Sequence, residues 1–169
     1  MVSVKRFMQD EPALVDATRK FICGFSHLPD PVVAVASRAQ SKTAQVAWVL
    51  FGTAIYQDRD IPEIMRLLSA FYEAFPEEKL WTLPVPAAGA INDVVERTFE
   101  SRDWSMFEHV AGIFWSVGLF VRHHPDLVAW ARERSPEEMW RDLGEIYFMG
   151  KAAVRPKACA AIYRIVSAE

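Results

Sequence analysis

The segment from Ser41 to Tyr56 constrains the fold more than any other part of the chain. Ser41 is placed to cap a helix, and the residues that follow are apolar on almost every side: Val46, Trp48, Val49, Leu50, Phe51, Ile55 and Tyr56. A helix that is apolar all round belongs at the centre of a protein, covered by other elements. This run and the apolar run at 110–121 are both shorter than the roughly 18–20 residues that cross a bilayer. We therefore predict a central buried helix and no membrane segment.

The other elements are predicted from helix-start signals and from apolar residues at helical spacing. The clearest start is Ser135-Pro136-Glu137-Glu138, which combines a Ser cap, Pro at the first helical position and Glu two positions later. Seven to nine helices are expected, with candidate starts near residues 12, 31, 42, 61, 87, 105, 126, 136 and 156. Ser105 and Glu108 are candidates for a capping box, and Gly150 is placed to end the helix that starts at Pro136.

No stretch shows the sustained two-residue alternation of a β-strand. The predicted fold is therefore all-α, a compact bundle of seven to nine helices with short turns. Residues 1–169 are expected to form a single domain, and the extended LWTLPVP connector at 80–86 is the only candidate sub-boundary. Large side chains on the helical stripes are expected to face inward: Trp104, Trp115, Leu119, Met139, Trp140 and Tyr147.

The charge distribution is more informative than its sum. The chain is 51% hydrophobic and 24% charged with a formal net charge of −3, which excludes a disordered tail and a uniformly basic nucleic-acid-binding surface. Acids are concentrated at 58–79, whereas 31–56 and 150–166 contain bases and no acid. Each acid-free stretch spans a predicted helix-turn-helix junction. A helix start with nearby bases is a favourable place for a phosphate.

These junctions supply the candidate nucleic-acid-binding residues, which are Arg38, Lys42, Lys151, Arg155 and Lys157. The alternative interpretation is that they are ordinary solvated surface bases. A continuous basic strip formed by these residues would favour nucleic acid, and scatter would favour a protein-interaction module.

Several other chemistries are not indicated by the sequence. The two cysteines, Cys23 and Cys159, are far apart and fit reduced thiols in a cytoplasmic protein. No metal-ligand spacing, glycine-rich phosphate loop or nucleophile elbow is present, so we expect neither a metal nor a cofactor. Among the four histidines, His124 precedes Pro125 and is expected to end a helix as a cation that suits the helix dipole.

Lys42 is the only candidate catalytic residue. A lysine at the start of an apolar helix is suited to Schiff-base chemistry when it is partly desolvated. An ordinary lysine that extends its amine to solvent is the favoured interpretation of this position. The run Arg38-Ala39-Gln40-Ser41-Lys42-Thr43, followed by Leu83-Pro84-Val85-Pro86, resembles helix-hairpin-helix DNA glycosylases of the archaeal 8-oxoguanine type. The resemblance covers about a dozen positions, and it implies that Lys42 would be the nucleophile. Ala88 stands where that family has its assisting aspartate, and Ala36 where it has the hairpin glycine.

Three functions follow from these observations. The favoured one is a non-enzymatic, nucleic-acid-associated subunit of a larger nucleoprotein assembly, which contacts the phosphate backbone through the basic junctions. The second is a protein–protein interaction module or homo-oligomer that uses aromatic surface such as Trp81, Trp130 and Trp140. The third is a lysine-dependent DNA glycosylase or lyase.

Overall fold

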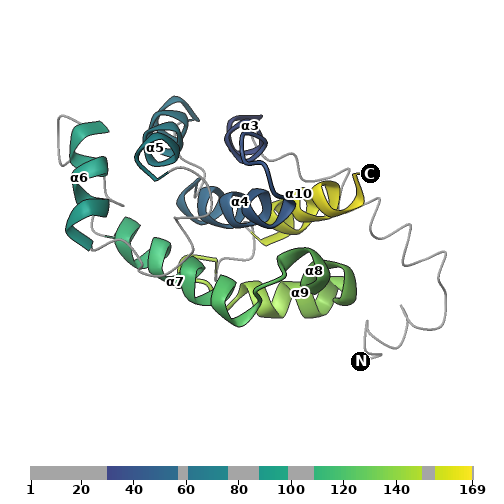
Figure 1. Cartoon of the computed structure of the whole chain (residues 1–169). Helices are drawn as coiled ribbons and strands as arrows, with labels where there is room; N and C mark the ends of the chain where they lie inside the picture. The colour runs from purple at the N-terminus through teal and green to yellow at the C-terminus, as the bar shows by residue number, and fades with distance from the viewer. Residues whose placement is uncertain (1–29, 57–60, 76–87, 99–108, 150–154, 169) are drawn as a thin grey trace.

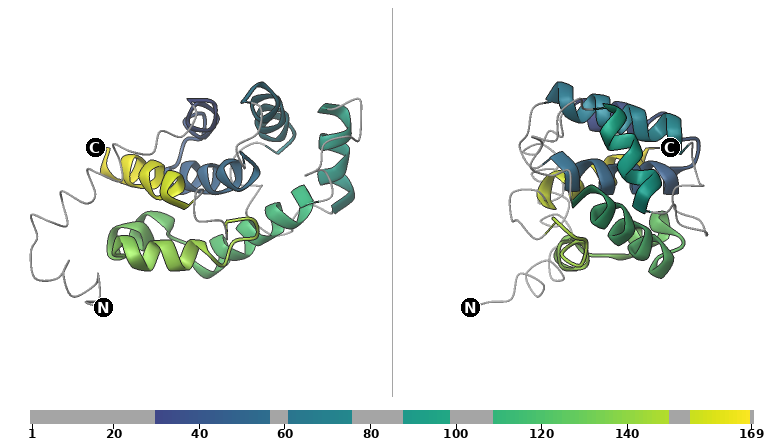
Figure 2. Two further views of the ribbon diagram at one scale, coloured as in Figure 1. Left: turned by 180° about the vertical axis from the view of Figure 1, so that it is seen from behind. Right: turned by 90° about the vertical axis from the view of Figure 1, so that its left-hand side faces the viewer.

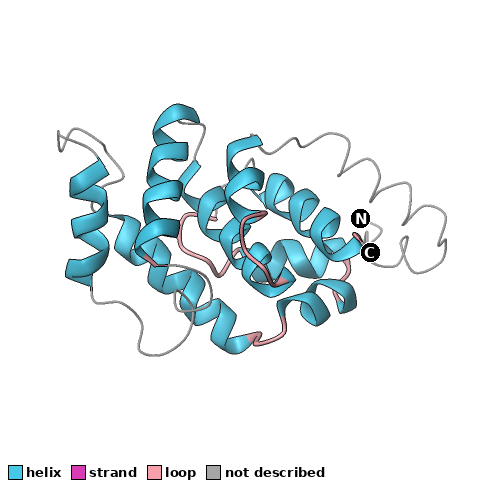
Figure 3. Cartoon of the chain, turned by 45° about the horizontal axis from the view of Figure 1, so that its top comes forward, coloured by secondary structure: helices cyan, strands magenta, loops and turns pink. Residues whose placement is uncertain are grey.

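The computed structural model describes residues 30–56, 61–75, 88–98, 109–149 and 155–168, and in these ranges all regular structure is helical (Figure 3). This confirms the predicted all-α class. The helices are α3 (Asp30–Ala36), α4 (Lys42–Tyr56), α5 (Ile61–Ala74), α6 (Ala88–Thr98), α7 (Val110–His123), α8 (Leu127–Glu133), α9 (Pro136–Leu143) and α10 (Arg155–Ser167). The expected helix near residue 12 and the 80–86 connector lie outside the described residues.

The helices form three layers with α4 in the middle (Figure 1). In Figure 1, α3 and α5 lie above α4, α10 lies beside it, and α7, α8 and α9 lie below, while α6 closes the end between α5 and α7. The same order appears from behind and from the side (Figure 2). Five helices contact α4, namely α3, α5, α7, α8 and α10.

The burial of α4 confirms its predicted central position. Every residue from Val46 to Ile55 is buried. Phe51 is packed edge-to-face on Phe71 of α5, with ring centroids 5.2 Å apart, and on Phe114 of α7, at 5.5 Å. One side chain of α4 therefore connects the upper and lower layers. This packing follows from a sequence that leaves the helix no polar face.

The two predicted caps, Ser41 and Ser135, form the expected bonds, and Asp126 caps a third helix start that was predicted without a capping residue. The Ser41 hydroxyl accepts from the Ala44 N–H at 3.1 Å, and Asp126 accepts from two N–H groups at the start of α8. Ser135 and Glu138 form a complete capping box at the start of α9. These bonds use donors that a helix start leaves unpaired, which is why short local motifs predicted the caps at Ser41 and Ser135.

One predicted boundary is wrong, and another falls outside the described residues. Gly150 does not end α9, because the helix stops at Leu143 and Gly144 is its C-cap. Ile146 and Tyr147 consequently lie in the turns that follow α9. The helix expected from residue 105 is described only from Val110, where His109 is the N-cap and its side chain makes no capping bond. Ser105, Glu108 and Trp104 lie outside the described residues.

A polar junction joins α7, α8 and α9. Oδ2 of Asp142 accepts from Nε1 of Trp130 at 3.1 Å and from Nε of Arg134 at 2.9 Å. This contact raises the pKa of the Arg134 guanidinium. His124 ends α7, with its ring centroid 4.7 Å from that of Phe120. Desolvation lowers the pKa of His124, so the expectation of a cationic helix end is wrong and the neutral imidazole is favoured.

Candidate functional site

The predicted bases fall into two groups at opposite ends of α4. Lys42 is the first residue of α4, and its Nζ donates to the carbonyl of Ala168 just beyond α10. Nζ of Lys157 lies 4.9 Å from the ring centroid of Tyr56, the last residue of α4. The two helices are therefore antiparallel, and a helix of this length separates the groups by about 20 Å. Lys151 lies outside the described residues.

Lys42 has a structural partner. Together with Arg132 of α8, whose Nη2 donates to the Val166 carbonyl at 3.0 Å, it binds carbonyls at the end of α10. Cations are favourable at a helix C-terminus because the last carbonyls have no partner within the helix. The amine that a Schiff-base mechanism needs therefore caps α10. Among the described residues, no contact positions or activates this amine as a nucleophile.

Arg38 and Arg155 also make structural contacts. The Arg38 guanidinium lies 4.3 Å from the ring centroid of Tyr72, whose hydroxyl donates to the Arg38 carbonyl at 2.8 Å. Nε of Arg155 donates to Met149 O at 2.7 Å, and its Nη1 donates to Trp140 O at 3.1 Å. These contacts hold the α3–α4 turn on α5 and the start of α10 on α9.

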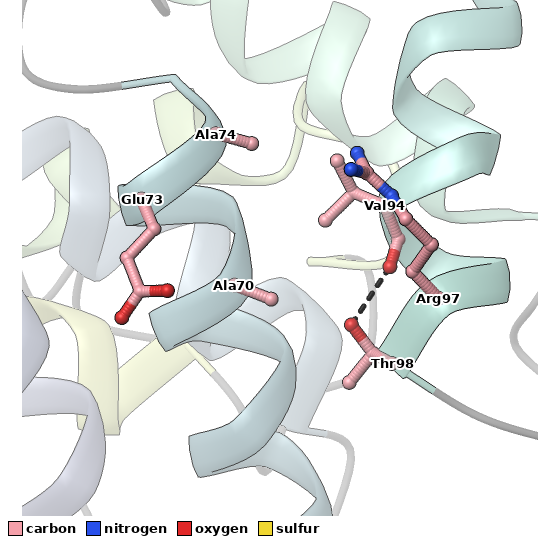
Figure 4. Close-up of a pocket in the computed structure, with 6 residues that line it drawn as sticks. All are labelled: Ala70, Glu73, Ala74, Val94, Arg97 and Thr98. Carbon is pink, nitrogen blue, oxygen red and sulfur yellow. Dashed lines mark hydrogen bonds between the residues drawn. The ribbon is translucent and has the colours of Figure 1, made fainter.

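A groove of about 460 Å³ lies between α5 and α6 (Figure 4). It is lined by Ala70, Glu73, Ala74, Val94, Arg97 and Thr98. Its polar groups do not converge on one point. Thr98 Oγ1 donates to Val94 O at 2.7 Å, Arg97 Nε donates to Asp93 O at 3.1 Å, and the Glu73 carboxylate points away from α6. A catalytic site needs converging groups, so this groove does not form one.

Among the described residues, the most exposed large hydrophobic side chains lie on α7 or beside it. Trp115 is 48% exposed, Leu119 49% and Tyr147 46%. Trp115 and Leu119 lie one helical turn apart. Tyr147 lies beside them, since a Cβ added at the exposed Gly112 would be 3.3 Å from a carbon of the Tyr147 ring. We call these three residues the α7 aromatic surface.

Tyr147 is held firmly on this surface. Its backbone N–H donates to the Ser116 hydroxyl at 2.8 Å, and its own hydroxyl shares a hydrogen bond with Nδ1 of His109 at 3.1 Å. The next residue, Phe148, has a φ of 68°, an uncommon conformation for a bulky side chain. Its ring centroid lies 4.6 Å from that of Tyr147. The loop is thus held in a strained conformation that presents Tyr147 outward.

This surface overturns the inward orientation predicted for Trp115, Leu119 and Tyr147. The helical periodicity of α7 carried a signal that could have predicted this exposure. One side of the helix is buried and consists of Val110, Ile113, Phe114 and Val117. Trp115 and Leu119 lie away from that side. The tryptophans expected at an interaction surface are elsewhere. Trp130 is 4% exposed, Trp140 is half-buried, and Trp81 is not among the described residues.

The comparisons with known proteins give no further guide, because no protein-family model, curated protein or solved structure matches the chain. The described residues contain no group of three or more His, Cys, Asp or Glu that could hold a metal ion. None of the helices in the described ranges is both long and apolar enough to cross a membrane.

Proposed function

We propose that this protein is a helical interaction module that binds another protein chain through the α7 aromatic surface. The observation that carries the proposal is the exposure of about half of each of Trp115, Leu119 and Tyr147 on one face. Aromatic side chains are common anchors of protein interfaces. The two hydrogen bonds of Tyr147 fix its position before binding, which lowers the entropy lost in a complex.

Site-specific photo-cross-linking in the native cell tests this proposal. A benzophenone amino acid replaces Leu119 or Trp115, and in a matched control it replaces Met65, which is 38% exposed on α5. We expect protein adducts at the two α7 positions and none at Met65. The proposal fails when the α7 positions give no protein adduct under conditions where the full-length variants are folded.

A second function, contact with a nucleic-acid backbone, is favoured by the charge of α3, α4 and α10. These helices pack together, and their described residues carry only one acid, Asp30. Lys157 and Arg164 are seven residues apart on α10, which places them on the same side of the helix about 10 Å apart. Such a pair is suited to sequence-independent contacts with phosphates, as expected of a subunit in a nucleoprotein assembly.

Fluorescence anisotropy with labelled single- and double-stranded DNA and RNA tests this second function. We expect binding at 20 mM salt that weakens steeply with salt, and roughly three- to tenfold weaker binding for Lys157→Glu or Arg164→Glu. Arg141→Glu is the control, because Arg141 is an exposed base on the acid-rich α9. No measurable binding at low salt, or equal losses in all three variants, rejects this function.

A further inference from the structure

We draw no further inference here: the strongest candidate, the exposed α7 aromatic surface on the lower layer of the fold, belongs to the site already proposed, and nothing in the structure shows what covers it.

Discussion

Gly52 lies where α3 and α5 both pack closely on α4. A Cβ added at this position would lie 2.8 Å from Cγ1 of Val32 and 3.2 Å from Cδ1 of Leu68. Val32 is buried and has a short, β-branched side chain, so it has little freedom to move away. Because Gly52 has only a hydrogen as its side chain, α3 and α5 can approach α4 more closely than an alanine at this position would allow.

We predict that Gly52→Ala lowers the free energy of unfolding by about 1–3 kcal/mol, because the cost of overpacking exceeds the gain in helix propensity. Urea denaturation measures this change. Gly89→Ala is the matched control, since a Cβ there meets nothing within 4 Å and the residue is exposed on α6. The control is expected to gain about 0.5–1 kcal/mol. An equal gain in both variants would contradict the tight packing at Gly52.

The positions of the candidate residues could be predicted from the sequence more readily than their partners. Lys42 and Arg155 were correctly expected at helix ends. Lys42 binds a carbonyl 126 residues away, and Arg155 binds carbonyls 6 and 15 residues away, and no local motif encodes these pairings. The exposure of Trp115 was missed for a related reason. Residue type predicts burial only on average, whereas the side of α7 that is covered depends on α4 and α6.

At the scale of elements, Arg155 determines how α10 is attached to α9. Its side chain donates to carbonyls of Trp140 and Met149, and its guanidinium lies against the turn at Gly144, where an added Cβ would be 3.0 Å from Nη1. The guanidinium is planar and branched, so its separate N–H groups can reach both carbonyls at once. A base assigned to phosphate binding from the sequence therefore has a packing role in the structure.

We predict that Arg155→Lys destabilises the protein by about 1–2 kcal/mol even though the charge is kept, because one ammonium cannot replace both guanidinium bonds. Thermal and urea unfolding measure the loss, and Arg141→Lys on the exposed side of α9 is the control, expected within about 0.5 kcal/mol of wild type. If Arg155 contributed only charge, the two variants would be equally stable.

Local capping motifs predicted element boundaries well where the necessary partners are close in sequence. Ser135 and Glu138 satisfy each other, so their capping box did not depend on the rest of the fold. The end of α9 was different. Glycine at 144 and glycine at 150 are equally good stop signals in sequence, and the choice of 144 accompanies the tertiary contacts that hold Tyr147 on α7.

At the scale of the whole molecule, the junction of α7, α8 and α9 couples stability to pH. Desolvation is the largest cause of the lowered pKa of His124, and the charge of Asp142 opposes it. The imidazole therefore takes up a proton more readily in the unfolded chain than in the folded one. Stability is lost as the pH falls through the ordinary histidine pKa of 6.5 toward the lower pKa of His124 in the folded state.

We predict that the free energy of unfolding falls more steeply for wild type than for His124→Gln between about pH 7.5 and about pH 5.5. Urea denaturation across this range measures the difference. Parallel curves for wild type and His124→Gln would contradict the assigned cause.

The central position of α4 has a consequence for synthesis of the chain. Its upper cover, α3 and α5, is made close to it in time, but α10 is completed only some 110 residues later. At translation rates of about 5–20 residues per second, one side of α4 waits roughly 5–20 s for that cover. During this interval the nascent chain carries a helix that is apolar all round without the cover that α10 provides.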